Sequence, residues 1–378
     1  MALITTSRLI HGDCMRHLRS LAPDSVDLVC TDPPYGIGFM DKSWDRFENK
    51  AFQSFIAETG RALIRVMKPG AFLFMTMTPR QDSLTQAIAG LADAGFNTRF
   101  TSLYWTFASG FPKALNIGKA VDKNAGRARE LIQEYRVPDI TGGNYGEGKR
   151  AYAGKVVRRT RGTGSLEGSY GGFQPKPAVE VIIVAMKPLA ASTYADQALK
   201  NRKGVTWLDD CRIPSAASMT IHHTHSGTMA GGGAGRDVLP AYRTSGDERF
   251  PANLLVSDDV LDGMTGNKPD AYSRFFSLDA WMRTVPFLKV PKAKKRTRSG
   301  NTHPTVKPLA LMSYLITLGS RPGDVVLDPF LGSGTTAVAA KLLGRRYIGI
   351  EREAGYVAIA RARVKAAHAD TLQHVPAR

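Results

Sequence analysis

Cysteine is scarce in this sequence, with three residues among 378. Cys14, Cys30 and Cys211 stand far apart and form no C-x-x-C pair. This spacing predicts neither a disulfide framework nor a thiolate zinc site, so we expect three reduced thiols. The HHTH segment at 222–225 has no further cluster of ligand-type residues at suitable spacing, and we expect a loop there. The sequence therefore predicts no metal centre.

Long apolar runs are also missing from the chain. No run approaches the roughly 20 residues that a helix needs to cross a bilayer. The first residues, MALITTSRLIHGD, do not have the basic-then-apolar layout of a secretory signal. We therefore expect a cytoplasmic protein with no membrane partner.

Acidic residues are outnumbered, with 33 Asp and Glu against 51 Lys and Arg and a formal net charge of +18. Such an excess says nothing about the fold, but it favours a polyanionic partner such as nucleic acid. A chain of 378 residues also exceeds the usual length of a single domain. We therefore expect either two domains or one domain with a large insertion.

Both ends of the chain alternate strand-like and helix-like segments. Short apolar runs bounded by turn residues read as buried strands, and the segments between them have helical spacing. Pro69-Gly70 is expected to end the first of these helices. The alternation predicts an α/β fold with a mostly parallel sheet and helices on both faces. The expected strands are 25–32, 71–77 and the two ends of 324–353, and the expected helices are 49–70, 82–96, 305–320 and 355–370.

The middle of the chain departs from this alternation. Residues 122–175 are rich in Gly, Arg, Lys and Tyr and have no apolar period, and 222–237 is again polar and glycine-rich. Only 179–188 and 249–257 read as strands in this part. We interpret the polar stretches as partly mobile insertions on the α/β core.

A glycine loop, DPFLGSGTT (328–336), separates a strand from a helix. Gly332 and Gly334 allow a tight turn and a close approach to a ligand, and the free N–H groups of the next helix point to the same place. Glu351 ends the following strand, where an acid suits the hydroxyls of a ribose. Ala337 replaces the third glycine of G-x-G-x-x-G, so spacing alone leaves a nicotinamide dinucleotide open. Nothing near the loop looks like a hydride-transfer site.

The segment TDPPYG (31–36) puts an acid, two prolines and an aromatic ring where a buried strand ends. The exocyclic amine of a base attacks poorly because its lone pair is delocalised into the ring. Acceptors on its N–H bonds, from the Asp32 carboxylate and the Pro33 carbonyl, would localise that pair, and Pro34 would aim the carbonyl. Tyr35 offers a ring face on which a flipped base can stack. The segment predicts a site that activates a base amine.

These motifs resemble those of the β-class amino-group DNA methyltransferases, which depend on S-adenosylmethionine. In that family D-P-P-Y precedes the target-recognition region and F-x-G-x-G follows it, as Asp32–Tyr35 and Phe330–Gly334 do here. HPTVKP (303–308) and HGDC (11–14) are similar to further family segments. The resemblance implies a Rossmann-like methyltransferase fold with an inserted target-recognition region. It implies the following division: 1–121, catalytic half of the core; 122–175, basic Gly-rich insertion; 176–187, core strand; 188–285, target-recognition region; 286–378, cofactor-binding half.

The resemblance also implies roles for single residues. The target amine and base would be held by Asp32, Pro33, Pro34 and Tyr35. For Asp13 a helix N-cap, and for Lys307 a lysine at a helix start, are open alternatives. The residues implied to bind S-adenosylmethionine are Asp13 at the adenine amine, Thr305 and Lys307 at the methionine carboxylate, Asp328, Phe330, Gly332, Ser333, Gly334 and Thr335 around the methionine part, and Glu351 at the ribose.

Two basic segments, 149–161 and 289–300, are expected to contact DNA phosphates, with solvated loops as the alternative. Phosphate contacts do not read sequence, so we expect the base-reading side chains in 188–285 without naming any. The residues expected at phosphates are Arg158, Arg159, Lys292, Lys294, Lys295 and Arg296.

The acid at position 32 favours adenine N6 as the target, since cytosine-N4 members of the family more often carry serine there. Cytosine N4, an RNA base, or an inactive DNA-binding relative remain as alternatives. The resemblance implies double-stranded DNA and a second copy of the chain, in a homodimer, as partners. Whether a cognate restriction endonuclease exists is left open.

Overall fold

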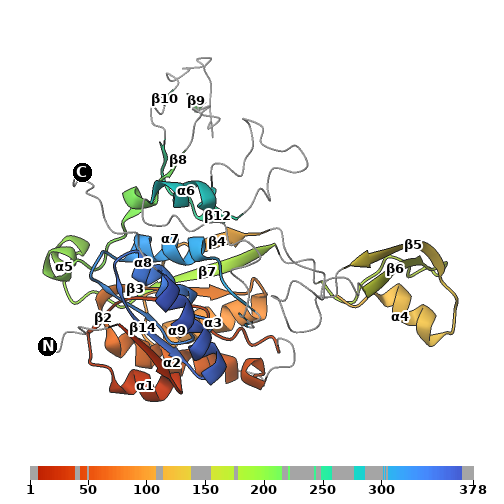
Figure 1. Cartoon of the computed structure of the whole chain (residues 1–378), viewed down its shortest axis with the longest axis horizontal. Helices are drawn as coiled ribbons and strands as arrows, with labels where there is room; N and C mark the ends of the chain where they lie inside the picture. Colours follow the sequence, from red (N-terminus) through yellow and green to blue (C-terminus); the bar gives the residue numbers. More distant parts are fainter. Residues whose placement is uncertain are drawn as a thin grey trace, which may run out of the picture.

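An eight-stranded sheet, in the order β1-β14-β13-β2-β3-β7-β4-β12, forms the centre of the computed structural model (Figure 1). Neighbouring strands are parallel except around β7, which is antiparallel to both β3 and β4. The predicted α/β fold with a mostly parallel sheet is therefore confirmed. The strands are β1 Arg8–His11, β2 Val26–Thr31, β3 Met67–Met77, β4 Leu103–Thr106, β7 Val179–Met186, β12 Leu254–Val256, β13 Val325–Asp328 and β14 Arg346–Glu351. The structure describes residues 7–38, 43–48, 51–107, 114–137, 155–173, 178–214, 220–221, 242–243, 248–257, 276–285, 301, 303 and 305–367.

Helices cover both faces of the sheet, and each layer has its own hydrophobic core. Successive residues of β3 supply the two cores in turn: Leu73 and Met75 pack in one, and Phe72 and Phe74 in the other. Within the described residues, no helix is long and apolar enough to span a membrane. One layer holds α1 Cys14–Ser20, α2 Ala51–Val66 and α3 Gln81–Asp93, and the other holds α6 Leu278–Thr284, α7 Leu309–Gly319, α8 Thr335–Leu342 and α9 Ala354–Ala366.

Two helix boundaries differ from the expected ones. The helix expected over 49–70 ends at Val66, and β3 begins at Met67, so that Pro69 and Gly70 lie inside a strand rather than stopping a helix. Gly70 has φ +80°, and a Cβ there would come within 2.7 Å of the Gly204 backbone nitrogen, which explains the glycine. The helix expected from 305 starts at Leu309, directly after Pro308.

The region 122–175, expected to be irregular, contains a hairpin of β5 Glu130–Val137 and β6 Lys155–Arg161. Helix α4 Ile117–Asn124 lies beside it, so the expected boundary at 121/122 falls inside a helix. Figure 1 shows this unit standing away from the central sheet. It was missed because a two-stranded ribbon is held by main-chain pairing, and most of its described side chains are exposed.

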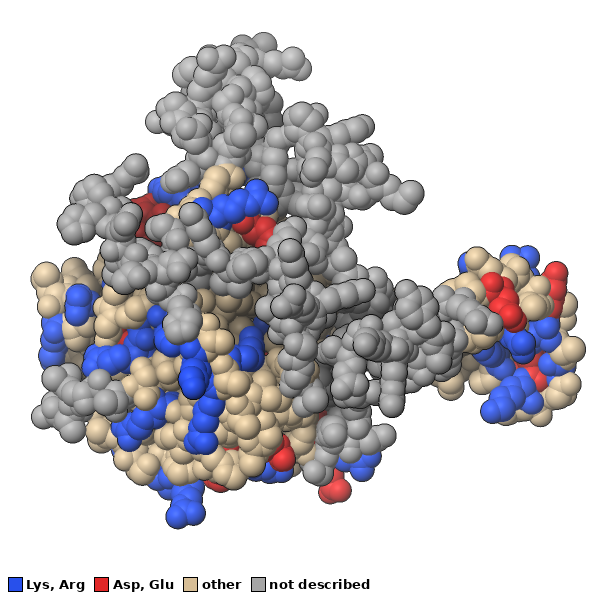
Figure 2. All heavy atoms as spheres, in the orientation of Figure 1, with Lys and Arg blue, Asp and Glu red and all other residues tan. Residues whose placement is uncertain are grey.

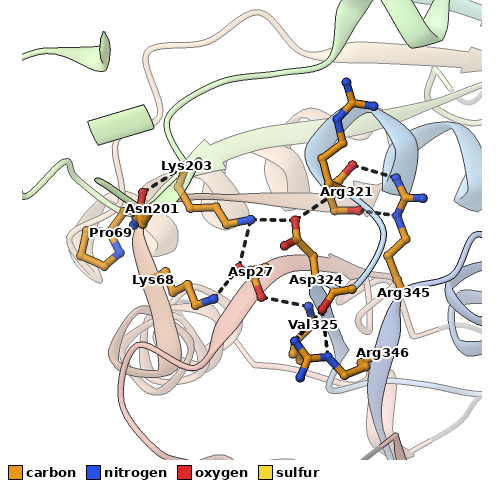
Figure 3. Close-up of polar contacts among 12 residues, drawn as sticks. Asp27, Lys68, Pro69, Asn201, Lys203, Arg321, Asp324, Val325, Arg345 and Arg346 are labelled. Carbon is orange, nitrogen blue, oxygen red and sulfur yellow. Dashed lines mark hydrogen bonds and ion pairs between the residues drawn. The ribbon is translucent and has the colours of Figure 1, made fainter. Parts of the chain in front are cut away.

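A buried ionic network ties the segment after α5 (Tyr194–Asn201) to the edge of the sheet where the parallel strands begin (Figure 3). Lys203 Nζ lies 3.0 Å from Asp27 Oδ1 and 2.8 Å from Asp324 Oδ2. Lys68 Nζ lies 2.6 Å from the same Asp27 oxygen. Burial would raise the pKa of Asp27, but these lysines and the Val325 N–H outweigh it and hold the pKa below its usual value. The start of the expected target-recognition region is thus bound to the core.

Candidate active site

A cavity of about 710 Å³ lies where β2, β13 and β14 end. It is lined by all four residues of the D-P-P-Y motif and by every expected cofactor residue except Gly334. The two motifs meet because β2 and β13 are neighbours, with Val29 opposite Leu327. Thr31 Oγ1 donates a hydrogen bond to Asp328 Oδ1 at 2.7 Å, which joins the starts of the two loops although they are 297 positions apart in the sequence.

The cavity is placed where the sheet changes direction. The chain leaves β2 towards β3 on one side and leaves β13 towards β14 on the other. The loops after two such strands diverge and leave a crevice at their carboxyl ends, where open α/β sheets bind ligands. The position of the cavity therefore follows from the topology and not only from its lining.

The D-P-P-Y loop is held open by a buried carboxylate, that of Asp45 in the short helix η2 (Ser43–Asp45). Asp45 Oδ1 accepts the N–H groups of Tyr35 at 2.7 Å and Gly36 at 2.8 Å, and Oδ2 accepts that of Ile37 at 3.2 Å. Three successive N–H groups after a proline pair need such a partner when they leave solvent. Sequence reasoning missed Asp45, although this unmet demand was a signal for it.

Asp32 has bonding partners on both carboxylate oxygens. Its Oδ1 accepts the Tyr35 hydroxyl at 2.8 Å and the Thr76 hydroxyl at 2.5 Å. Its Oδ2 lies 2.8 Å from Lys307 Nζ. The carboxylate is therefore fixed in orientation at the wall of the cavity.

Lys307 completes a four-residue cluster with Asp32, Tyr35 and Glu180. Besides Asp32, its Nζ lies 3.0 Å from the Tyr35 hydroxyl and 3.1 Å from Glu180 Oε2. An ammonium has three N–H donors, and this cluster offers it three acceptors. The side chain of Lys307 is 10% exposed, so these interactions are only weakly screened by solvent.

The cluster holds its charges in a definite pattern. Burial alone would lower the pKa of Lys307, but Asp32, Tyr35 and Glu180 outweigh it and the pKa stands well above its usual value. Burial raises the pKa of Glu180, and Asp32 adds to this while Lys307 opposes it. Burial also raises the pKa of Tyr35 well above its usual value. At neutral pH the cluster therefore contains an ammonium ion and a neutral phenol.

The structure gives two members of this cluster partners that the sequence did not predict, while both still line the cavity. Lys307, expected at the methionine carboxylate of the cofactor, lies against Asp32, two positions before the first residue of α7. Tyr35, expected to offer a free ring face, has its hydroxyl on Asp32 and Lys307 Nζ 5.4 Å from its ring centroid. Glu180 was missed altogether. Its signal was an acid at the start of an apolar strand, but only the antiparallel direction of β7 brings that end to the cavity.

The two glycines of the loop are required by their surroundings. Gly334 caps α8 with φ +87°, and a Cβ on it would come within 2.7 Å of Ala360 Cβ. Gly332 has φ +55°, and a Cβ would come within 2.8 Å of His303 Nε2. The backbone therefore lies close between α9 and the segment before α7: a Cβ at Gly334 would require α9 to shift, and one at Gly332 would displace the His303 side chain.

Buried side chains fix the shape of the same loop. Asp328 accepts the Phe330 N–H at 3.1 Å and the Thr336 hydroxyl at 2.6 Å, and burial raises its pKa to about 6. Arg363 Nη1, from α9, donates to the Ser333 carbonyl at 2.6 Å and its hydroxyl at 2.8 Å. Arg363 was not expected, because a basic helix so near the end of the sequence had no visible partner.

The expected ribose and adenine ligands already have backbone partners. Glu351 Oε2 accepts the Gly332 N–H and Oε1 accepts the Glu353 N–H, both at 2.8 Å. Asp13 caps α1 by accepting the Arg16 N–H at 3.0 Å, as its alternative reading stated. Both carboxylates still line the cavity, and each oxygen retains a second lone pair for a ligand.

The expected DNA contacts are only partly described. Lys292, Lys294, Lys295, Arg296 and the HHTH segment lie outside the described residues. Arg158 and Arg159 lie on β6, where Arg158 Nε donates to Glu134 Oε2 at 2.7 Å. Across the described part of the chain, no group of three or more His, Cys, Asp or Glu could hold a metal ion.

Comparisons with known proteins agree in one family. The family model named N6_N4_Mtase, described as DNA methylase, matches residues 26–362. Type II methyltransferase M2.DpnII of Streptococcus pneumoniae is 51% identical over 73 residues, which are 19% of this chain and 27% of that protein. Type II methyltransferase M.HinfI of Haemophilus influenzae is 45% identical over 86 residues, 22% of this chain and 24% of that protein. The matched part thus spans about a quarter of each relative.

Solved structures with a similar arrangement include two methyltransferases. The cytosine-N4-specific PvuII DNA methyltransferase has a TM-score of 0.48 and 16% identity, over 96% of this chain and 87% of that chain. A DNA modification methylase of Thermus thermophilus has a TM-score of 0.45 and 17% identity, over 96% of each chain.

Proposed function

The chain belongs to the DNA methylase family, and from that premise we propose that it transfers the methyl group of S-adenosylmethionine to an amino group of a base in duplex DNA. The observation that supports this most strongly is the joining of the D-P-P-Y loop and the glycine loop around one cavity, through Thr31 and Asp328. Neither loop alone could bring a base and a cofactor together.

The cavity fits a nucleoside cofactor. Its volume lies within the range of about 300–1,000 Å³ that is usual for small-molecule sites. Gly332 lines it with backbone alone, and Glu351 and Asp13 present carboxylates for the ribose and the adenine amine. When bound, S-adenosylmethionine supplies a methyl group activated by a sulfonium sulfur.

The cluster around Asp32 suits the activation of an amine. Asp32 accepts an N–H bond of the target nitrogen, which localises the lone pair, and it takes the proton that the nitrogen loses after forming its new bond. Lys307 places its ammonium 2.8 Å from that carboxylate, and Thr76 holds its orientation. Alignment of the reacting atoms supplies the rest of the rate enhancement.

We propose adenine N6 as the target, on the basis of the aspartate at position 32. The family covers both adenine-N6 and cytosine-N4 enzymes, so cytosine N4 is the alternative. An inactive relative would have no need for the bonded set of Asp32, Lys307 and Glu180. Duplex DNA as the substrate and a homodimer as the assembly complete the proposal.

The test is methyl transfer to DNA by the purified protein with a radiolabelled cofactor, followed by digestion and identification of the labelled nucleoside. Asp32→Ala should lower the rate by more than about 100-fold, since it removes a charge-assisted acceptor in the transition state. Its cofactor dissociation constant, from calorimetry, should stay within about twofold of the wild type. The exposed Asp82→Ala serves as the matched control.

If the labelled nucleoside is a cytosine nucleoside, the target is cytosine N4 rather than adenine N6. Absence of any labelled nucleoside, with intact cofactor binding, would contradict the proposed activity. Equal loss of rate and cofactor affinity in Asp32→Ala would show that Asp32 supports the cofactor pocket rather than the amine.

A further inference from the structure

The hairpin β5–β6 presents two different faces. Residues opposite each other in an antiparallel pair share a face, and faces alternate along each strand. Gln133 lies opposite Arg159 and Tyr135 opposite Val157, so these four residues share one face. Arg158 lies on the other face, opposite Glu134, to which it is ion-paired at 2.7 Å.

The face of Arg158 carries one contact between the hairpin and its support, although Arg158 and Glu134 are themselves exposed. Arg129 Nε donates to Thr160 Oγ1, which lies on that face, at 3.1 Å. The same guanidinium pairs with Asp122 of α4 and, at 2.7 Å, with Glu167. Arg129 thereby fastens helix α4 and the 162–173 loop to the face of Thr160, and no described contact of this kind engages Gln133, Tyr135 or Arg159 on the other face.

The outward face is exposed and basic. Gln133, Tyr135 and Arg159 are all exposed, and Arg159 forms no ion pair within the described residues. Residues 114–137 and 155–173 contain nine Lys and Arg against four Asp and Glu, and three of those acids are already paired with arginines. Figure 2 shows basic side chains on this unit, which stands clear of the core. The surface is complementary to a polyanion.

A two-stranded ribbon fits the major groove of B-DNA, which is about 12 Å wide. The side chains on this face are those that read base edges there: arginine binds the two acceptors of guanine, and glutamine binds adenine. The exposed ring of Tyr135 suits contact with a thymine methyl or a sugar. Phosphate contact alone would not require a glutamine directly opposite an arginine.

We propose that the β5–β6 face carrying Gln133, Tyr135 and Arg159 enters the major groove beside the target base and reads sequence there. This inference rests on the proposed function, because it assigns part of the target recognition of that enzyme. It places base-reading residues in 122–175, whereas the sequence alone predicted them in 188–285. It also gives Arg159, but not Arg158, a role in reading base edges.

The experiment begins with wild-type protein expressed in a bacterial strain without DNA methylation, whose DNA is sequenced with detection of modified bases. A duplex containing the mapped sequence and a scrambled duplex of equal length then serve as probes. kcat/KM and binding affinity are measured for the wild type, Arg159→Ala, Gln133→Ala and the matched control Lys123→Ala, which removes an exposed lysine of α4. Arg159→Lys retains the charge but not the planar fork.

Arg159→Ala and Arg159→Lys should lower kcat/KM on the mapped duplex about tenfold or more and broaden the mapped sequence at one base. Affinity for the scrambled duplex should be little changed in Arg159→Lys, and Lys123→Ala should stay within about twofold of the wild type on both probes. Equal melting temperatures of the variants show that folding is intact.

Three results would overturn the inference while the proposed function stands. Equal proportional losses on both duplexes would show a phosphate contact. Equal effects of Lys123→Ala and Arg159→Ala would show that only net charge matters. Unchanged methylation with altered sedimentation would show a protein-binding face instead. A wild type that modifies no base would refute the proposed function itself.

Discussion

Replacement of Lys307 by methionine tests the arrangement of the active site most directly. Methionine keeps the length of the side chain and removes the ammonium that bonds Asp32, Tyr35 and Glu180. The carboxyl groups of Asp32 and Glu180 would then lie near the Tyr35 hydroxyl with no lysine between them. Lys307 opposes the rise in the pKa of Glu180 that burial and Asp32 cause, so without Lys307, Glu180 takes up a proton at higher pH.

The size of the effect follows from the contact distances. An opposite charge within about 4–6 Å of a carboxylate shifts its titration by about 1 to 3 pH units. Lys307 Nζ lies 2.8 Å from Asp32 and 3.1 Å from Glu180. The acid limb of kcat/KM against pH should therefore move upward by at least about 1 pH unit, which is about tenfold in rate at any pH below both the original and the shifted limb. Activity should recover towards pH 9.

The assay is methyl transfer between pH 5 and pH 9, with cofactor affinity measured by calorimetry at each pH. Lys341→Met, which removes a lysine bonded to the Val364 carbonyl away from the cavity, is the matched control. An unchanged pH profile together with a large loss of cofactor affinity would refute this reasoning. That result would return Lys307 to the methionine carboxylate of the cofactor, where the sequence alone had placed it.

Three further predictions concern the support of the site. Lys203→Met should lower the free energy of unfolding by about 3–5 kcal/mol in urea titration, because it leaves the buried Asp324 without its lysine and Asp27 with Lys68 alone. The more exposed Lys68→Met should cost clearly less, and equal losses would contradict the network. Gly334→Ala should destabilise the protein and abolish cofactor binding in calorimetry, because Gly334 has a left-handed φ and the new Cβ would collide with Ala360. Normal cofactor binding would show that the glycine loop can change its conformation to accommodate the Cβ. Glu351→Ala should weaken cofactor binding at least about tenfold, and an unchanged dissociation constant would refute its ribose role.

Local sequence was sufficient for the elements and for the two loops of the site. The runs before Asp32 and before Asp328 are apolar and short, which is typical of strands buried on both faces, and both became neighbouring parallel strands. Gly332 and Gly334 stand where positive φ is needed. The ribbon of β5 and β6 was not predicted, because most of its described side chains are exposed and its sequence therefore has no apolar period.

The sequence by itself determined which segments are buried and which residues stand at strand ends, since burial and turn chemistry depend on neighbours within a few positions. Only the tertiary structure decided what those residues touch. The antiparallel direction of β7 brought Glu180 to Asp32, and the placement of the segment before α7 gave Lys307 the same partner. Strand direction and pairing depend on contacts between segments more than a hundred residues apart, and no local pattern records them.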